Sequence, residues 1–577
     1  MKSDKPNTAF AAEVEAALSH NPSALALAQY YRDGELIWRT RGEVLTQART
    51  VAYGLVHAGL MAAEPVLIMP FGDGEVDAAI CIVAAVLVGC PPLVLPALDG
   101  GFSNATAVLT HAQAITDARV VLVATRNHSQ IAAARDLVEA SGAPVMCLHL
   151  AALETATVVI ELPRRANRIA RCHALQLTSG TTGASRVCIW HAPAMRTAIA
   201  GVAHSMALGP GDRFFSWSGL HHTVGLLNFL FVSLLHGIPA TFMSPQVFAG
   251  NPAMWLRGLH ASGATITAAP NFALRQIADR VDPDLIAGLS LSGIRAIWNA
   301  GERVLPSSIS AMLETLSGTG LRPETLRANY GLAENTGGAT FSSTGDSPLL
   351  VDSLDAGAIE TRRIAADWSA GARRSDVATV GAPWPGLSVL TRDDYGRALS
   401  ERTVGQIVLD SPSRFEGYLY DQAATDAMFE GKLLLTGDLG YLRHGQLFWI
   451  GRSQDAINIR GRKIDPDEFT AVLEDIEGVD AGRFAAFGAV DPERGTERIV
   501  LIVELTSNDA KTQALRAIRR SAAEKLGVVP DEVVTLAPNT LATTISGKRR
   551  HRHYRQLWES GGAQFMHATE DGKTLLG

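Results

Sequence analysis

The chain has 577 residues, more than one hydrophobic core usually serves, so its length predicts two or more domains. Hydrophobic residues make up 47% and charged residues 19%, which is typical of a globular protein. The formal net charge of -7 argues against a nucleic-acid-binding surface. The five cysteines show no CxxC pair and no metal-ligand spacing, and the N-terminus MKSDKPNTAF has no apolar signal-peptide region. We therefore expect buried thiols in a reducing compartment, the cytoplasm.

Strand-like apolar runs alternate with Ala-rich helical runs from the first hundred residues onward. Residues 66–69, 120–124 and 145–148 are predicted to be buried strands, and residues 43–60 and 129–141 are predicted to be helices. This alternation predicts an α/β fold with parallel sheets covered by helices.

Residues 78–98 are almost wholly apolar and long enough to suggest a membrane span. The sequence GCPP at 89–92 interrupts the run, and no second span or charged flank accompanies it. The prediction is therefore a buried helix, a turn and a buried strand, with no membrane span.

The alternation of predicted strands and helices continues over residues 225–298 and changes after them. Residues 341–379 are rich in Ser, Asp, Ala and Arg and are predicted to be a loop-rich insertion. Short strands follow from residue 405, and after Arg452 a new unit of roughly 125 residues begins, a plausible small domain. The expected domains are residues 1–452 and 453–577.

The first motif is LQLTSGTTGAS at 175–185. Its Thr, Ser and Gly residues offer hydroxyls and unobstructed backbone N–H groups, which can wrap phosphate oxygens. It is not a Walker P-loop, because GxxxxGK[ST] is absent. The alternative is an ordinary solvated turn.

The second and third motifs are NYGLAENTG at 329–337 and LLLTGDLGYL at 433–442. Tyr330 offers a flat face for an adenine ring, and Glu334 can hold Mg²⁺ through nucleotide phosphates. A strand is predicted to stop at 436–437, so that Asp438 projects from its end toward ribose hydroxyls. The alternatives are a helix start with an exposed Glu334 and a hairpin with Asp438 in its turn.

The fourth and fifth motifs are WIGRSQDAINIRGRKIDPDEFTAVLE at 449–474 and TTISGKRRHRHYRQLW at 543–558. Arg452 follows a strand, so its guanidinium can bind ribose or phosphate. Lys548 follows a Ser-Gly turn near the end of the chain. The alternatives are a charged linker and a basic, solvated tail.

In this order and spacing, the five motifs resemble the adenylate-forming superfamily of acyl-CoA synthetases, peptide-synthetase adenylation domains and luciferases. The resemblance spans about residues 30 to 560. Within it, the segments WSGLHHTVGLLNFLF, MSPQVFAGNPAMWLRGLHASGATITAAPNFA and GLRPETLRANYGLAENT are most similar to the fatty acyl-AMP ligases that feed polyketide and peptide synthetases.

The resemblance implies a large N-terminal domain, built from two helix-covered sheets and a small β-barrel-like subdomain, and a small mobile α+β C-terminal domain. It implies ATP and Mg²⁺ as cofactors. His222 would lie at the acid pocket, and Lys548 would contact both the carboxylate and the α-phosphate. The hinge would be Gln454 and Asp455, and Mg²⁺ would contact Glu334 and Thr181. The implied ATP or AMP contacts are Thr178, Ser179, Gly180, Thr181, Thr182, Gly183, Asn299, Gly301, Glu302, Tyr330, Gly331, Glu334, Asp438 and Arg452.

The implied reaction makes acyl-AMP and pyrophosphate, then passes the acyl group to the phosphopantetheine thiol of an acyl carrier protein in polyketide, nonribosomal peptide or lipid biosynthesis. Two alternatives stay open: an acyl-CoA ligase, and a catalytically silent adenylate-binding module. The phosphate motif departs from the usual P-K-G by reading Ala-Ser-Arg-Val at 184–187, and the H-D-M-G segment has Thr223 in place of Asp. Apolar candidates for the acid pocket are Phe229, Phe231, Met243, Phe272 and Trp298.

Overall fold

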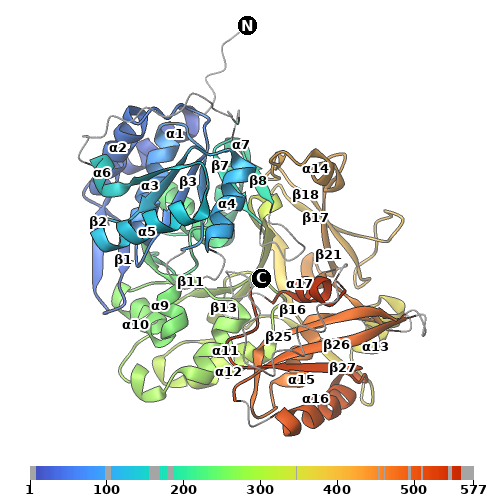
Figure 1. The fold of residues 1–577 in the computed structure, drawn as a ribbon. Coiled ribbons are helices and arrows are strands. Elements are labelled where there is room, and N and C mark those ends of the chain that lie inside the picture. The colour runs from blue at the N-terminus through green and yellow to red at the C-terminus, as the bar shows by residue number, and fades with distance from the viewer. Residues whose placement is uncertain are drawn as a thin grey trace.

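The computed structural model describes residues 8–97, 105–154, 169, 172–178, 186–345, 347–452, 455–459, 462–491, 496–507, 511–543 and 549–559. Two helix-covered sheets form the upper and middle parts of the molecule, and the C-terminal residues pack below and beside them (Figure 1). No described helix is long and apolar enough to cross a lipid bilayer.

The first sheet is parallel through β6, β5, β3, β4 and β7, with β8 and β19 antiparallel at one edge. Alternate residues of β3 face opposite sides, where α3 covers one face and α4 and α5 cover the other. Its elements are α1 (Thr8–Ser19), α2 (Arg41–His57), β3 (Val66–Pro70), α3 (Glu75–Leu87), β4 (Pro92–Val94), α4 (Ala105–Thr116), β5 (Val120–Ala124), α5 (His128–Ser141), β6 (Met146–His149), α6 (Leu150–Glu154), β7 (Ala174–Leu177), β8 (Val187–Trp190) and β19 (Gly417–Tyr418).

These bounds confirm the strands and helices predicted for the first part of the chain. The run at 78–98 divides into α3 and β4, with a turn at Gly89, where φ is +73°. Helix α2 begins at Arg41, two residues earlier than predicted, because Thr40 and Glu43 form a reciprocal capping box.

The second sheet is parallel from β13 through β12, β11, β9 and β10 to β1. Helix α3 and the π-helix η1 lie in the core between the two sheets, and α10, α11 and α12 cover the outer face. Its elements are β1 (Leu25–Tyr30), β2 (Leu36–Thr40), α7 (Ala192–Ser205), β9 (Phe214–Ser216), η1 (Val224–Phe231), α8 (Val232–His236), β10 (Ala240–Met243), α9 (Pro245–Gly250), α10 (Ala253–Ser262), β11 (Ile266–Ala268), α11 (Asn271–Arg280), β12 (Ala296–Asn299), α12 (Pro306–Thr315), β13 (Leu326–Leu332) and β14 (Gly337–Phe341), with 3-10 turns at Pro283–Ile286, Ser317–Thr319, Pro323–Thr325 and Ala333–Asn335.

An antiparallel unit continues from this sheet through β14 and β16. The described strands run β16-β22-β21-β18-β17 and do not close into a barrel. The loop-rich insertion predicted for 341–379 is wrong, because a strand, a helix and the start of another strand pack Leu354, Ile359 and Val377 into a small core. The elements are β15 (Val351–Asp355), α13 (Ala356–Arg362), β16 (Arg374–Pro383), β17 (Ser388–Arg392), β18 (Gly405–Asp410), α14 (Gln422–Ala427), β20 (Phe429–Glu430), β21 (Leu433–Arg443) and β22 (Gln446–Arg452).

The C-terminal residues have cores of their own. Two buried apolar clusters draw all their members from residues 457 to 558. The elements are β23 (Ile457–Ile459), β24 (Arg462–Ile464), the 3-10 turn Pro466–Glu468, α15 (Phe469–Leu473), β25 (Val479–Asp491), β26 (Thr496–Leu505), α16 (Lys511–Leu526), β27 (Glu532–Leu536) and α17 (His551–Leu557).

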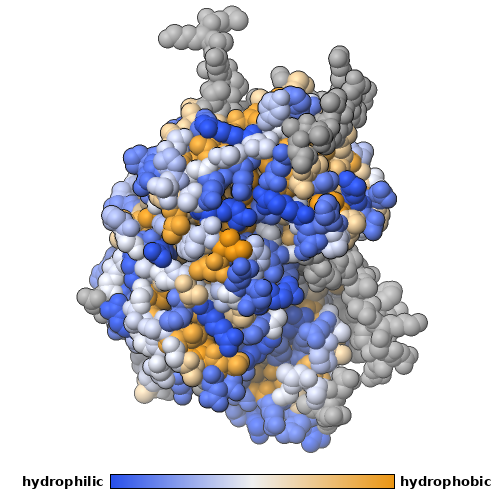
Figure 2. All heavy atoms as spheres, turned by 90° about the vertical axis from the view of Figure 1, so that its left-hand side faces the viewer, coloured by the Kyte–Doolittle hydropathy of each residue, from blue (hydrophilic) through white to orange (hydrophobic). Residues whose placement is uncertain are grey.

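On the face turned toward the viewer in Figure 2, hydrophobic residues are scattered among hydrophilic ones.

Candidate functional site

A cavity of about 1470 Å³ lies at the carboxyl ends of parallel strands β9, β11, β12 and β13. Open α/β sheets bind ligands at this edge, because the loops that follow neighbouring strands meet there. The cavity is also lined by residues of the C-terminal unit, from Glu474 to Arg552. Predicted site residues in the lining are Thr178, His222, Gly301, Tyr330, Gly331, Glu334, Asp438 and Arg452.

Tyr330, Asp438 and Arg452 form one polar cluster in this cavity, in which Tyr330 and Asp438 are buried and Arg452 is partly exposed. The Tyr330 hydroxyl donates a hydrogen bond of 2.6 Å to Asp438 Oδ2. Arg452 Nε lies 3.5 Å from Asp438 Oδ1, and the two residues are paired directly across β21 and β22. Burial raises the pKa of Asp438, while the charge of Arg452 and the Tyr330 hydrogen bond act in the opposite direction. The cluster therefore presents an oriented carboxylate and a guanidinium side by side.

The strand predicted to stop before Asp438 instead continues to Arg443. The register against β18 shifts here: Leu435 pairs with Val408, and Leu439 pairs with Gln406. Gly437 has φ of +74°, a conformation that suits glycine. This bulge re-aims Asp438 into the cavity without ending the strand.

Glu334 lies on the 3-10 turn that follows β13, half-buried at the cavity wall. Its Oε1 accepts a hydrogen bond of 2.6 Å from the Tyr418 hydroxyl. Burial and the nearby Glu334 charge raise the pKa of Tyr418, so this hydroxyl stays protonated and keeps donating. Carboxylate oxygens are the ligands that Mg²⁺ prefers, and Glu334 fits that role. Tyr418 was not identified from the sequence, because it lies outside every motif.

Thr178 and Arg186, which flank the predicted phosphate loop, are joined by hydrogen bonds, and we call this pair the Thr178–Arg186 hairpin. Thr178 N–H donates to the Arg186 carbonyl at 2.8 Å, and Arg186 N–H donates to Thr178 Oγ1 at 3.0 Å. The predicted residues Ser179, Gly180, Thr181, Thr182 and Gly183 lie outside the described residues. Arg186 forms an ion pair of 3.0 Å with Asp421, and its guanidinium lies 5.3 Å from the centre of the Tyr418 ring. Arg186 thus connects the hairpin to Tyr418, the residue that donates to Glu334.

His222 and its neighbour His221 lie on the loop between β9 and the π-helix. Their ring centres are 4.0 Å apart, and both residues line the cavity. Burial lowers the pKa of His221 to about 3, so its ring is neutral near neutral pH. Residues 224–231 form a π-helix, a rare element that is frequent at functional sites.

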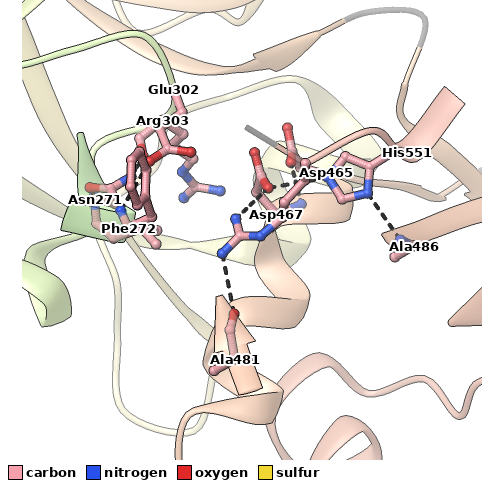
Figure 3. A network of polar contacts seen from close by, with 11 residues as sticks. Asn271, Phe272, Glu302, Arg303, Asp465, Asp467, Ala481, Ala486 and His551 are labelled. Carbon is pink, nitrogen blue, oxygen red and sulfur yellow. Dashed lines mark hydrogen bonds and ion pairs between the residues drawn. The ribbon is translucent and has the colours of Figure 1, made fainter. Parts of the chain in front are cut away.

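Asn299 and Glu302 do not line the cavity, although the sequence placed them at the adenine side. Asn299 Nδ2 donates to Asn271 Oδ1 at 3.0 Å, and Glu302 Oε1 accepts from the Phe272 N–H at 3.4 Å. Figure 3 shows Asn271, Phe272, Glu302 and Arg303 grouped together. These contacts hold the loop that carries Gly301, where φ is +90°.

The C-terminal unit places a second charged network beside the cavity. Asp467 accepts hydrogen bonds from Arg549 Nη1 at 2.8 Å and from His551 Nε2 at 3.3 Å (Figure 3). Burial alone would raise the pKa of Asp467, but the hydrogen bond from His551 and the charge of Arg549 lower it. Asp455, the described half of the predicted hinge, pairs with Arg552 at 2.5 Å. Gln454 and Lys548 lie outside the described residues.

The five apolar candidates for the acid pocket divide into two groups. Phe229, Phe231 and Met243 are buried in the core and do not line the cavity, whereas Phe272 and Trp298 do. Trp217 and Phe248 also line it, stacked with ring centres 4.0 Å apart. Sequence analysis did not single out these two, because an aromatic in an apolar run gives no sign of which face it presents.

Comparisons with known proteins point in one direction. A family model described as AMP-binding enzyme matches residues 14–419. The long-chain-fatty-acid–AMP ligase FadD26 of Mycobacterium marinum is 28% identical over 566 residues, covering 92% of this chain and 93% of that protein. The putative fatty-acid–CoA ligase fadD25 of Mycobacterium tuberculosis is 29% identical over 373 residues, covering 60% of this chain and only 62% of that protein.

Solved structures show the same similarity. A chain from work on fatty acyl-adenylate ligases from E. coli and L. pneumophila superposes with a TM-score of 0.83 at 25% identity, covering 96% of this chain and 98% of that chain. The McyG A-PCP structure complexed with phenylalanyl-adenylate gives a TM-score of 0.82 at 21% identity, covering 97% of each chain. At that lower identity the likeness concerns the fold alone.

Proposed function

This chain belongs to the AMP-binding enzyme family, and we propose that it is a ligase that activates a carboxylic acid with ATP, releasing pyrophosphate and holding the acyl-adenylate. The observation that carries this proposal is the cavity itself. It gathers the Tyr330–Asp438–Arg452 cluster, Glu334 and the Thr178–Arg186 hairpin at one sheet edge. We propose that a fatty or other small acyl acid is the substrate.

In the proposed reaction, a carboxylate oxygen forms a bond to the α-phosphorus of ATP while the bond from that phosphorus to the bridging oxygen breaks. The electron pair leaves with pyrophosphate, and no general base is needed because the acid arrives ionised. Two anions must approach, so cationic groups have to stabilise the charge. Arg452 and Asp438 orient the ribose, and Lys548 contacts the carboxylate and the α-phosphate.

The donor set beside the phosphate hairpin fits Mg²⁺. Among the described residues no group of three or more His, Cys, Asp or Glu side chains is placed to hold a metal. A single carboxylate suffices for Mg²⁺ when substrate phosphates and waters complete its shell, and Glu334 offers one. The ion bound there, with Thr181 as a further contact, would neutralise phosphate charge. The Tyr418 hydroxyl restrains the Glu334 carboxylate through its hydrogen bond to Oε1.

For the second half-reaction we propose transfer of the acyl group to the phosphopantetheine thiol of an acyl carrier protein. The name of the FadD26 relative supports an adenylate-forming ligase, whereas the name of the fadD25 relative keeps CoA open as the acceptor. We also propose that residues 1–452 and 453–577 are separate domains joined at Gln454 and Asp455. The C-terminal clusters that exclude all earlier residues support this division. The five free thiols support a reducing compartment, for which we propose the cytoplasm.

The test is release of pyrophosphate from ATP and Mg²⁺ across a panel of carboxylic acids, followed by mass spectrometry of the adenylate. The acceptor is then tested with CoA and with a holo-carrier protein in parallel. Pyrophosphate release with at least one acid, with labelled adenylate chased onto the carrier thiol, is the expected result. Failure of every acid would favour a silent adenylate-binding module.

A further inference from the structure

One part of the cavity is lined by Asn228 and Trp298 next to a pair of glycines, Gly337 and Gly338, at the start of β14. A Cβ on Gly337 would lie 3.3 Å from Asn228 Oδ1. A Cβ on Gly338 would collide with the Phe341 ring, whose centre lies 5.2 Å from that of Trp298. Asn228 and Trp298 thus both border this glycine-lined part of the cavity, which we call the Asn228–Trp298 subsite.

Both polar side chains of this subsite are buried. Asn228 is 3% exposed and Trp298 is 1% exposed. Within the part of the chain that the structure describes, Asn228 Oδ1 and Trp298 Nε1 have no hydrogen-bond partner. A buried polar atom without a partner destabilises a fold, so two such atoms in residues that line one cavity call for an explanation.

The surrounding fold holds both groups where they are. Asn228 is the one polar residue of the π-helix Val224–Phe231, in which every other residue is Val, Gly, Leu or Phe. Trp298 precedes Asn299 on β12, and the two side chains point to opposite faces of the strand. Asn299 binds Asn271 behind the sheet edge, so the indole is left on the cavity side.

We propose that the Asn228–Trp298 subsite selects a carboxylic acid that carries a hydroxyl group. The indole N–H donates and the amide oxygen accepts, and a hydroxyl can bind either group, because its oxygen accepts while its proton donates. An unsubstituted hydrocarbon chain would leave both groups unpaired. This inference rests on the proposed function, since it names the class of acid that the same cavity activates.

The experiment compares each unsubstituted acid with its hydroxylated counterpart in pyrophosphate release. The panel holds straight-chain, branched and aromatic acids, with the hydroxyl placed at the α carbon, the β carbon or the ring. We expect kcat/KM for at least one hydroxylated acid to exceed that of its unsubstituted partner by about tenfold or more, because a site built to bind a hydroxyl rejects the analogue that lacks it. Preference for the unsubstituted member of every pair would overturn the proposal.

Two variants test the residues. Asn228→Leu and Trp298→Phe each remove one polar partner, and each should reduce the hydroxyl preference toward parity. Trp255→Phe is the matched control, because Trp255 is also fully buried, donates to Thr267 Oγ1 at 3.3 Å and does not line the cavity. The control should keep the wild-type preference.

The outcomes separate this inference from the proposed function. Pyrophosphate release without a hydroxyl preference, or a preference that both variants retain in full, refutes the subsite alone. Absence of release with every acid refutes both.

Discussion

Removal of the Tyr330 hydroxyl tests the proposed role of the Tyr330–Asp438–Arg452 cluster in nucleotide binding. Tyr330→Phe keeps the ring and its volume but deletes the 2.6 Å hydrogen bond to Asp438. Asp438 is 4% exposed, so its carboxylate would depend on Arg452 alone. Hydrogen bonds to charged groups contribute about 1.5–3 kcal/mol, and we expect the free energy of unfolding to fall by that amount.

The chain contains a matched control for this variant. Tyr441 donates at 2.9 Å to the buried Asp352, which also pairs with an arginine, Arg443, and none of the three lines the cavity. Tyr441→Phe should therefore lose a similar free energy of unfolding while leaving nucleotide binding intact. The two variants separate a loss of stability from a loss of function.

The assay measures KM for ATP and KM for the acid by pyrophosphate release. In Tyr330→Phe the loosened Asp438 carboxylate must be reordered when ATP binds, which we expect to cost about 1–1.4 kcal/mol, or roughly a five- to tenfold rise in KM for ATP. KM for the acid should stay near the wild-type value. An unchanged KM for ATP, or an equal rise in Tyr441→Phe, would refute the assignment of this cluster to the nucleotide.

Three further predictions concern other parts of the site. Lys548→Ala should lower the rate of adenylate formation about a hundredfold or more with an unchanged circular dichroism spectrum, because one cation at the reaction centre is worth several kcal/mol; near-normal turnover would mean that the basic tail is only solvated. Asp467→Asn should lower kcat about tenfold and leave KM for ATP nearly unchanged, because the anchor of Arg549 and His551 is weakened just after Lys548; a change confined to KM would contradict this positioning role. His221 has its pKa lowered from 6.5 to about 3 by burial, so the folded protein resists its protonation and loses stability as pH falls below 6.5; the stability difference between wild type and His221→Gln should shift by about 1.4 kcal/mol per pH unit in that range, measured by urea unfolding, and a pH-independent difference would argue against a buried neutral ring.

The alternation of apolar strands and helices could be recognised in the sequence, because both faces of a parallel sheet are buried and its strands are therefore continuous hydrophobic runs. Residues 66–69 and 120–124 could be assigned from hydrophobicity alone, and β3 and β5 confirm them. Local pattern failed at 341–379, because the apolar residues of β15 and β16 are few and spaced among charges, and only packing against Tyr441 and Phe448 makes them a core.

The identities of the charged and aromatic site residues were also present in the sequence, because ordered motifs mark Tyr330, Glu334, Asp438 and Arg452. The sequence did not show how these side chains are arranged relative to one another. A bulge, rather than a strand end, aims Asp438 at Tyr330, and the register of β21 against β22 places Arg452 opposite it. Side-chain partners from distant segments, such as Tyr418 on Glu334 and Phe341 on Trp298, come together only through long-range contacts. Sequence determines which chemistry is available, whereas tertiary packing decides which groups meet, since burial and register depend on the whole chain.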